Sequence, residues 1–175
     1  NIIATTVTSS TSADANDITL TTVTSGNITL GTVTATGAGD VTLAAAGAGV
    51  IANAAANAGA EIVADVFTVT DATSIGAGGN GAVDINATTA SITGVSGAIL
   101  VDAVGSGGLA LTATTDAAGG ITVTTSTEAL TLTSVITNNG AISVTATGQN
   151  IIATTVTSST DSNANDITLT TVTSG

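Results

Sequence analysis

Apolar residues recur at every second position along most of this chain, in short runs that each follow a small or acidic residue. The first clear run is Asp17-Ile-Thr-Leu. Seven later runs have the same form: Asp40-Val-Thr-Leu, Glu61-Ile-Val-Ala, Ala82-Val-Asp-Ile, Ala98-Ile-Leu-Val, Gly120-Ile-Thr-Val, Ala141-Ile-Ser-Val and Asp166-Ile-Thr-Leu. Two-residue alternation is the periodicity of a β-strand, and Thr, Val and Ile suit a pleated surface. The pattern therefore predicts an all-β chain of short strands.

The runs begin about 21 residues apart, a spacing within the range of solenoid coils. In the unit 120–140, Ile121 and Val123 share one face, Leu130 and Leu132 share another, and an Asn-Asn-Gly turn closes the unit. Gly, Asn, Asp and Ser punctuate the other units in the same way, as turn residues do. Each unit thus reads as one coil of two or three strands with tight corners.

A β-sandwich or barrel and a β-solenoid both suit this alternation, but they differ in how neighbouring strands run. Hairpins join antiparallel strands in a sandwich or barrel, whereas the coils of a solenoid stack in parallel without a length limit. The similar unit size and the absence of bulky residues favour the solenoid. We therefore predict an all-β, right-handed parallel β-helix with about seven coils of about 21 residues in each 149-residue super-repeat, which would advance about 34 Å.

The first 26 residues return almost unchanged near the end of the chain. Residues 1–26 and 150–175 differ only at Ser12/Asp161, Ala13/Ser162 and Asp14/Asn163. Repetition at a fixed spacing is the signature of a repeat architecture. We therefore expect residues 1–149 to form one super-repeat and residues 150–175 to begin the next, with no linker, inside a much longer protein.

One stretch offers an alternative to strand. Residues 44–60, AAAGAGVIANAAANAGA, are rich in alanine, which favours helix. Gly47, Gly49, Asn53 and Asn57 interrupt the stretch, and its spacing fits the 21-residue register. A coil with a wall of small residues is the preferred interpretation.

Composition narrows the functions that the chain can have. It has no Lys, Arg, His, Cys, Met, Trp, Tyr or Pro, one aromatic residue (Phe67), 43% apolar residues and a net charge of −12. A chain without cations cannot neutralise phosphates, so binding of nucleic acid or anionic lipid by this segment is improbable. No apolar run approaches the 18 residues of a membrane-spanning helix. The core is expected to be thin and aliphatic.

Catalysis has little support in the residue types present. Without His or Cys there is no Ser-His or Cys-His system, and only carboxylate-pair hydrolysis remains formally open, through Asp65 with Asp71 or Asp14 with Asp17. Carboxylates at coil corners for solubility and turn formation explain these residues equally well. We expect no enzymatic activity and no required cofactor.

Calcium is the better candidate ligand. Asp17, Asp40 and Glu61 begin consecutive units, so in-register stacking would place them in one column, where oxygen-ligated divalent cations relieve repulsion. Residues 78–85, GGNGAVDI, contain Asp84. This segment is similar to a calcium-binding nonapeptide but has one extra residue before the Asp. Solvated carboxylates with diffuse counter-ions are the alternative for all four positions.

The many hydroxyl and amide side chains suggest two further roles. Repeated Thr-x-Thr segments resemble the arrays of ice-binding proteins, but residues 40–60 and 82–97 lack them, so the array is broken. Thr is also an ordinary outward residue of strands. Asn27-Ile-Thr and Asn86-Ala-Thr match the N-glycosylation sequon, which a chain rich in Asn and Thr also produces by chance.

Motifs such as DITLTTVTSGNITL and GDVTLAAAGAG resemble repeat regions of giant bacterial surface proteins, of the filamentous haemagglutinin-like adhesin or autotransporter passenger type. The resemblance covers the whole chain and implies a secreted β-helix with a scaffold or adhesive role. We expect a structural repeat of an extracellular fibre, stalk, sheath or matrix protein on a prokaryotic cell, which self-associates into filaments head to tail or through tandem repeats. A repeat that binds glycans or surfaces and an ice-binding solenoid are the alternatives.

Overall fold

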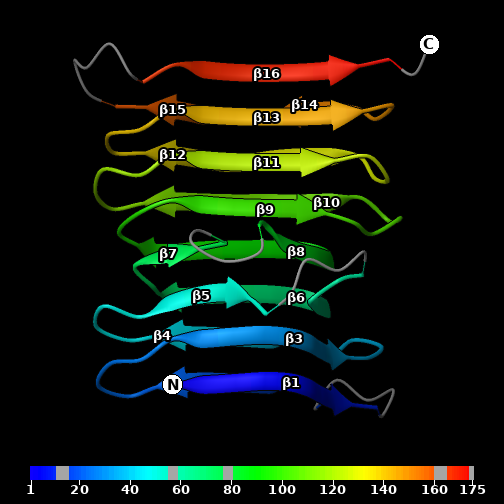
Figure 1. The fold of residues 1–175 in the computed structure, drawn as a ribbon. Coiled ribbons are helices and arrows are strands. Elements are labelled where there is room, and N and C mark those ends of the chain that lie inside the picture. The colour runs from blue at the N-terminus through cyan, green and yellow to red at the C-terminus, as the bar shows by residue number, and fades with distance from the viewer. Residues whose placement is uncertain (11–15, 55–58, 77–80, 160–164, 174–175) are drawn as a thin grey trace.

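The chain forms a stack of parallel β-coils, as Figure 1 shows from the N-terminus at the bottom to the C-terminus at the top. The computed structural model describes residues 1–10, 16–54, 59–76, 81–159 and 165–173. These residues contain sixteen strands and no helix, and every strand pairing is parallel. The prediction of an all-β solenoid is confirmed.

Two long faces make up the stack, and we call them the front face and the rear face. The front-face strands are β1 (Ile2–Ser9), β3 (Ile28–Ala35), β5 (Val50–Asn53), β7 (Ser74–Ile75), β9 (Ile99–Ala103), β11 (Ile121–Thr125), β13 (Ile142–Thr147) and β16 (Ile167–Val172). The rear-face strands are β2 (Ile18–Thr22), β4 (Val41–Ala45), β6 (Ile62–Asp71), β8 (Val83–Val95), β10 (Leu109–Thr115), β12 (Leu130–Thr137), β14 (Ile151–Ala153) and β15 (Val156–Ser158).

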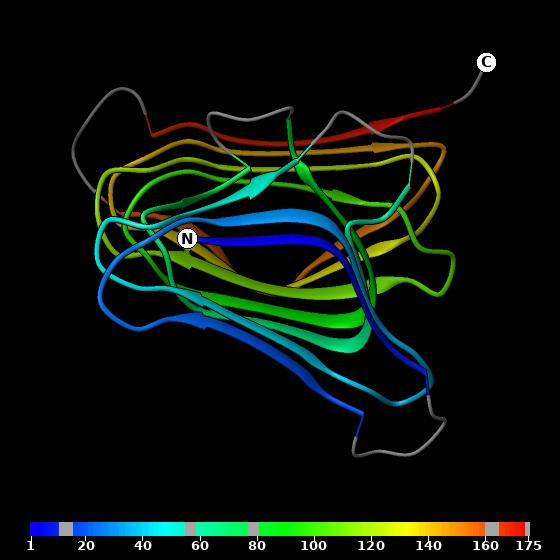
Figure 2. The same ribbon diagram turned by 60° about the horizontal axis from the view of Figure 1, so that its bottom comes forward.

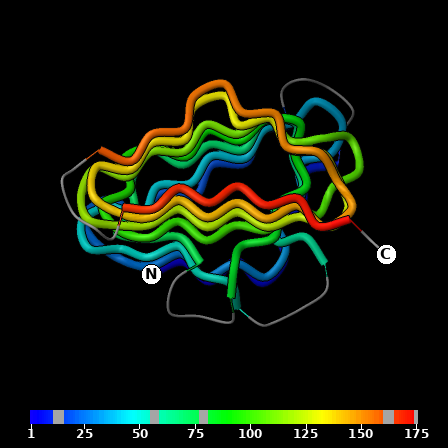
Figure 3. Tube along the Cα trace, turned by 90° about the horizontal axis from the view of Figure 1, so that it is seen from above, coloured from blue at the N-terminus to red at the C-terminus, as the bar shows by residue number. Residues whose placement is uncertain are grey.

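The coil is right-handed. Seen from the C-terminal end in Figure 3, the chain runs along the front face, turns to the rear and returns counterclockwise while it rises toward the viewer. This is the hand expected of a crossover between parallel strands.

A ladder of identical side chains forms the core behind the front face. Eight isoleucines stack in register, one for each coil, and those between the two ends are completely buried: Ile2, Ile28, Ile51, Ile75, Ile99, Ile121, Ile142 and Ile167. A branched side chain has few rotamers and packs well against a copy of itself on the next strand. This ladder therefore fixes the register of the whole front face.

The rear face has a more varied core column. Phe67, the only aromatic residue, is fully buried with Val41 on the coil below and Ala90 on the coil above. The small alanine compensates for the volume of the phenyl ring in this column.

The cross-section changes along the stack. In the first coils β1 and β3 bend, and a short third side forms where Val7, Val33, Ile62 and Ile85 stack in register. Figure 2 shows this three-sided outline at the N-terminal end, whereas Figure 3 shows a flatter outline at the C-terminal end. Ile85 also pairs with Ala103 of β9, which is where the third side merges into the front face.

Buried threonines and glycines form the corners. The Thr22 hydroxyl donates to the Gly26 carbonyl (3.1 Å), and Thr137 donates in the same way to Gly140. The glycines allow coils to approach closely, because a Cβ on Gly119 would lie 2.3 Å from the backbone of Gly97. The alanine-rich stretch 44–60 contains the end of β4 and all of β5, and its residues 55–58 lie outside the described part.

The coils are 21 to 26 residues long along the front face, so seven coils separate Ile2 from Ile167. The stack of about seven coils is confirmed, although the prediction placed all seven within one 149-residue repeat. The 149-residue repeat itself is shorter: between Ile2 and Ile151 the chain passes from one face to the other thirteen times, which is six and a half coils. The axial advance of one repeat is therefore about 31 Å at 4.8 Å per coil.

Candidate functional site

The C-terminal end of the stack presents core residues that no further coil covers. Inward-facing Ile167 and Leu169 of β16 are 45% and 42% exposed. Their counterparts at the N-terminal end are more deeply buried: Ile18 is 7% exposed and Leu20 is partly buried. The open end is therefore an apolar surface with one unpaired strand edge on each face.

The N-terminal copy shows which partner suits these residues. There β3 covers β1, pairing Ile28 with Ile2 and Val33 with Val7. In the same coil β4 covers β2, pairing Val41 with Ile18. Because residues 150–159 repeat residues 1–10, the edge of β14 and β15 offers the same series of donors, acceptors and side chains as β1.

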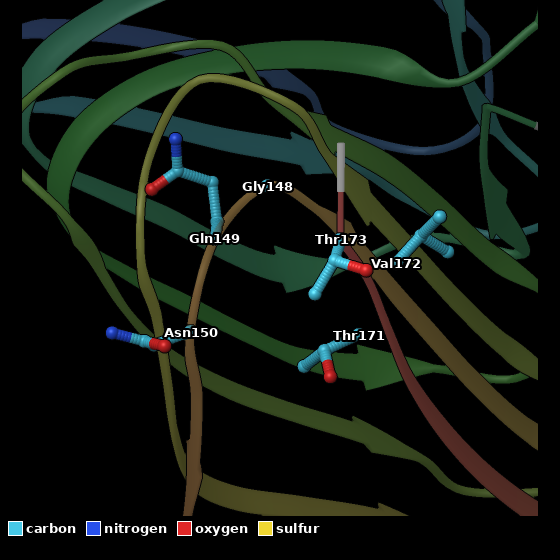
Figure 4. Close-up of a pocket in the computed structure, with 6 residues that line it drawn as sticks. All are labelled: Gly148, Gln149, Asn150, Thr171, Val172 and Thr173. Carbon is cyan, nitrogen blue, oxygen red and sulfur yellow. The ribbon is translucent and has the colours of Figure 1, made fainter. Parts of the chain in front are cut away.

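An open hollow of about 320 Å³ lies at one corner of this end, lined by Gly148, Gln149, Asn150, Thr171, Val172 and Thr173. Figure 4 shows these residues around the corner between β13, β14 and the end of β16. In the N-terminal copy the space above Asn1 is filled by the next corner, because Gly26 lies against Asn1 and the Asn27 N–H donates to the Asn1 Oδ1 (2.9 Å). The hollow above Asn150 is the equivalent space.

Side chains at strand starts join one coil to the next. Asn1 and Asn27 form one such series on the front face, since the Asn27 Oδ1 accepts from the Val50 N–H (3.0 Å). Asp17 and Asp40 form another on the rear face: the Asp17 Oδ1 accepts from the Asp40 N–H (3.0 Å). In the first coils, the polar residue before an apolar run therefore bonds through its side chain to the backbone of the coil above.

The four calcium candidates occupy two places rather than one column. Asp17 and Asp40 are neighbours, but the Asp40 Oδ1 accepts from the Val66 N–H (3.1 Å), so Val66 and not Glu61 follows in that series. Glu61 is fully buried on the third side, where its Oε2 accepts from the Asp84 N–H (2.7 Å). The expected column of three was wrong because β6 enters the rear face without the corner loop that precedes β4, which shifts the stacking by five residues.

Asp84 also has a carboxylate neighbour on the front face. It pairs with Asp102 on the next coil, and burial together with the Asp102 charge raises the pKa of Asp84. Burial likewise raises the pKa of Asp102, which a hydrogen bond with Thr124 opposes. No group of three or more potential metal ligands occurs in the described ranges, and calcium binding stays a prediction.

Glu128 is a structural carboxylate that sequence reasoning missed. It is 2% exposed, and its Oε1 and Oε2 accept from the N–H groups of Gly105 and Gly108, both at 3.0 Å. Burial raises the pKa of Glu128, and these two hydrogen bonds oppose the rise. The glycine-rich segment 105–108 predicts a turn, but nothing in the sequence indicates that Glu128 of the next coil fills it.

The remaining candidates are dispersed. Asn27 and Asn86 are exposed, and glycosylation at either stays a prediction. Asp65 and Asp71 lie six residues apart on the extended β6, roughly 20 Å along the strand, well beyond the separation of a glycosidase pair. Asp14 lies outside the described residues, so the pair Asp14–Asp17 has no structural description.

Outward hydroxyls form one continuous column on the rear face, from the first coil to the sixth: Thr19, Thr42, Thr68, Ser91, Thr112 and Ser134. The adjacent column begins at Thr21 and is interrupted by Ala44 and Asp71. An array of two adjacent threonine columns is therefore interrupted, as the sequence indicates. The single column of hydroxyls is continuous.

Comparisons with protein-family models, with curated proteins and with solved structures return no match to this chain. Within the residues that the structure covers, no helix is long and apolar enough to span a membrane. The parallel β-solenoid is thus the level at which the chain can be classified.

Proposed function

We propose that this chain is a structural repeat of a long extracellular fibre, stalk, sheath or matrix protein on a prokaryotic cell surface, of the filamentous haemagglutinin-like or autotransporter passenger type. One observation carries the proposal: the open end exposes Ile167 and Leu169, whereas their counterparts in the N-terminal copy, Ile18 and Leu20, are buried and partly buried. A surface whose natural covering is the next coil of the same protein is a surface for elongation.

Two physical terms favour elongation at this end. Burial of Ile167 and Leu169 removes apolar area from water, which is worth about 25 cal/mol for each Å². The edges of β14, β15 and β16 offer unpaired N–H and C=O groups that a further parallel strand satisfies. Against these acts the net charge of −12, which repels neighbouring chains and which divalent cations or low pH would reduce.

The test compares two substitutions on β16. Leu169→Lys places a cation on the inward side, where it can reach solvent at the open end of a single chain but would be buried without a partner in a fibre. Thr168→Lys places the same charge on the outward side of the same strand. We expect filaments in electron micrographs of the parent chain and of Thr168→Lys, and folded single chains for Leu169→Lys.

Circular dichroism with a β-sheet spectrum provides the control that both variants fold. Filaments of Leu169→Lys that match those of the parent chain would contradict elongation through this end. A folded parent chain that stays monomeric at high concentration, with and without divalent cations, would contradict the fibre proposal as a whole.

The continuous hydroxyl column supports a second candidate, an adhesive repeat that binds glycans or another hydroxyl-rich surface. Its outward residues Thr42, Thr68 and Thr112 project from the rear face at the spacing of the coils, about 4.8 Å. Replacing Thr42, Thr68 and Thr112 with valine would abolish glycan binding or cell agglutination if the column is the contact. Thermal hysteresis of the parent chain and of this triple valine variant tests ice binding.

A further inference from the structure

At each end of the stack, the front face and the rear face finish at different heights along the fibre axis, so each end has the shape of a step. At the N-terminal end the chain begins with β1 on the front face, so the front is half a coil lower than the rear, where β2 follows. At the C-terminal end the chain finishes with β16 on the front face, so the front is half a coil higher than β14 and β15. Figure 1 shows β1 lowest and β16 highest.

These steps fit together in one orientation only. The lowest strand of an added copy must enter the recess above β14 and β15, which is on the rear face. An added copy placed front over front would set β1 on β16 and leave the recess open, with the edge of β14 unpaired. A continuous chain leads to the same result, because the strand after β16 must lie on the rear face.

The repeated sequence already shows this change of face within the chain. Ile18 stacks on the rear face with Val41, whereas its counterpart Ile167 stacks on the front face with Ile142. The counterpart of front-face Ile2 is Ile151, which stacks on the rear face with Leu130. The offset of six and a half coils thus moves every outward residue of one repeat to the opposite side in the next.

We propose that the open C-terminal end binds a second copy of this repeat after a half turn about the fibre axis, so that the front face of one repeat continues as the rear face of the next. This rests on the proposed fibre function and adds its symmetry. In a fibre of tandem repeats the period is then two repeats, thirteen coils or about 62 Å, rather than one. In a fibre assembled from separate chains, each of which spans seven and a half coils, the period is two chains, fifteen coils or about 72 Å. The hollow lined by Asn150 and Thr171 then receives Asn1 of the added copy, in the place that Asn27 takes above Asn1 within the chain.

The half turn has a consequence for whatever contacts the fibre. The acidic pair Asp84–Asp102 lies on the front face and the hydroxyl column of Thr42 and Thr68 on the rear face. In a half-turn fibre both features occur on both sides and alternate every repeat. Such a fibre presents equivalent lateral surfaces in two opposite directions, which suits sheets and bundles.

Engineered disulfides can distinguish the half-turn arrangement from the front-over-front arrangement, because the chain has no cysteine of its own. Ile3, Ile152 and Thr168 all face outward and are exposed, and they lie at opposite ends of the stack, so a bridge can form only between molecules. In the half-turn arrangement Ile3 of the added copy lies beside Ile152, within the Cα separation of a disulfide. In the front-over-front arrangement it lies beside Thr168.

We expect the pair I3C and I152C to yield a ladder of covalent multimers when assembled chains are oxidised, and the pair I3C and T168C to yield none. The opposite result would overturn the half turn while leaving the fibre intact. Filaments in which neither cysteine pair forms a cross-link would also overturn the placement of β1 on β14 and β15. A chain that forms no filaments and no multimers would overturn the fibre proposal and the half turn together.

Discussion

The two copies of the repeated sequence, residues 1–26 and 150–175, have different environments in one molecule. Ile18 is 7% exposed on the rear face, whereas Ile167 is 45% exposed on the front face. The local sequence is the same over β2 and β16, so the difference comes from the neighbours alone. In a solenoid, burial is a property of the stack, because each coil is covered by the coil that follows it.

The change of face has a simple origin. The apolar runs recur about every 21 residues, but the coils are 21 to 26 residues long, so the runs drift around the coil. The runs at Ile18 and Val41 lie on the rear face, and those from Ile99 to Ile167 lie on the front face. Seven runs therefore occupy six and a half coils.

The largest expected difference between the copies comes from core truncation. Ile18→Ala should lower the free energy of unfolding by about 2–3 kcal/mol, because it removes a buried side chain beneath Val41. Ile167→Ala should cost less than about 1 kcal/mol, since that side chain is already half exposed. Urea unfolding followed by circular dichroism measures both, and equal losses would mean that the two copies are equally covered.

A smaller difference should follow from a corner hydroxyl. Thr22 donates to the Gly26 carbonyl and accepts from the Ala46 N–H (2.9 Å), so Thr22→Val leaves both groups without this partner at a cost of about 1–2 kcal/mol. Its counterpart Thr171 is exposed, and Thr171→Val should change stability by less than about 0.5 kcal/mol. Thr22→Ser restores the hydroxyl and serves as the control. A Thr22→Ser variant as unstable as Thr22→Val would argue for methyl packing instead.

Removing a corner carboxylate should give the smallest difference in stability between the two copies. Asp17→Ala deletes the acceptor of the Asp40 N–H at an exposed site, so the loss should stay under about 1 kcal/mol. Faster exchange of the Asp40 amide proton is the more sensitive measurement. Asp17→Asn keeps an acceptor oxygen and should protect that amide, and Asp166→Ala should leave it unchanged. Unaltered exchange in Asp17→Ala would contradict the role of this bond.

Acid should stabilise the middle of the stack without changing the difference between the copies. The pKa values of Asp84, Asp102 and Glu128 are raised in the folded chain, so the folded state binds more protons than the unfolded state between the ordinary and the raised values. Their contribution to stability is greatest below the ordinary carboxyl pKa and is lost as the pH rises through the raised values. We expect Tm to rise from pH 7 to pH 4.

The variant Asp84→Asn/Asp102→Asn should weaken this pH dependence, whereas Asp17→Asn/Asp166→Asn serves as a comparison with two carboxylates outside that pair. A Tm that falls in acid would contradict the assignment. The absence of any basic side chain simplifies the measurement, because no ion pair with Lys, Arg or His is broken at low pH.

Parts of the candidate site could be predicted and parts could not, for identifiable reasons. The neighbouring positions of Asp17 and Asp40 follow from strand starts in coils of similar form. The position of Glu61 was predicted wrongly, because a corner loop present before β4 is missing inside β6 and no local pattern reports its loss. Glu128 fills a glycine turn of another coil, and such a contact depends on stacking rather than on spacing.

The sequence by itself determined the strand periodicity, the aliphatic core, the number of apolar runs and the restart at residue 150, since each depends on local alternation or on direct repetition. Only the tertiary structure decided which face each run occupies and how the second copy is oriented. The physical reason is that corner lengths add along the chain. A few residues more or fewer at each corner leave every strand intact, yet together they turn the repeat by half a coil.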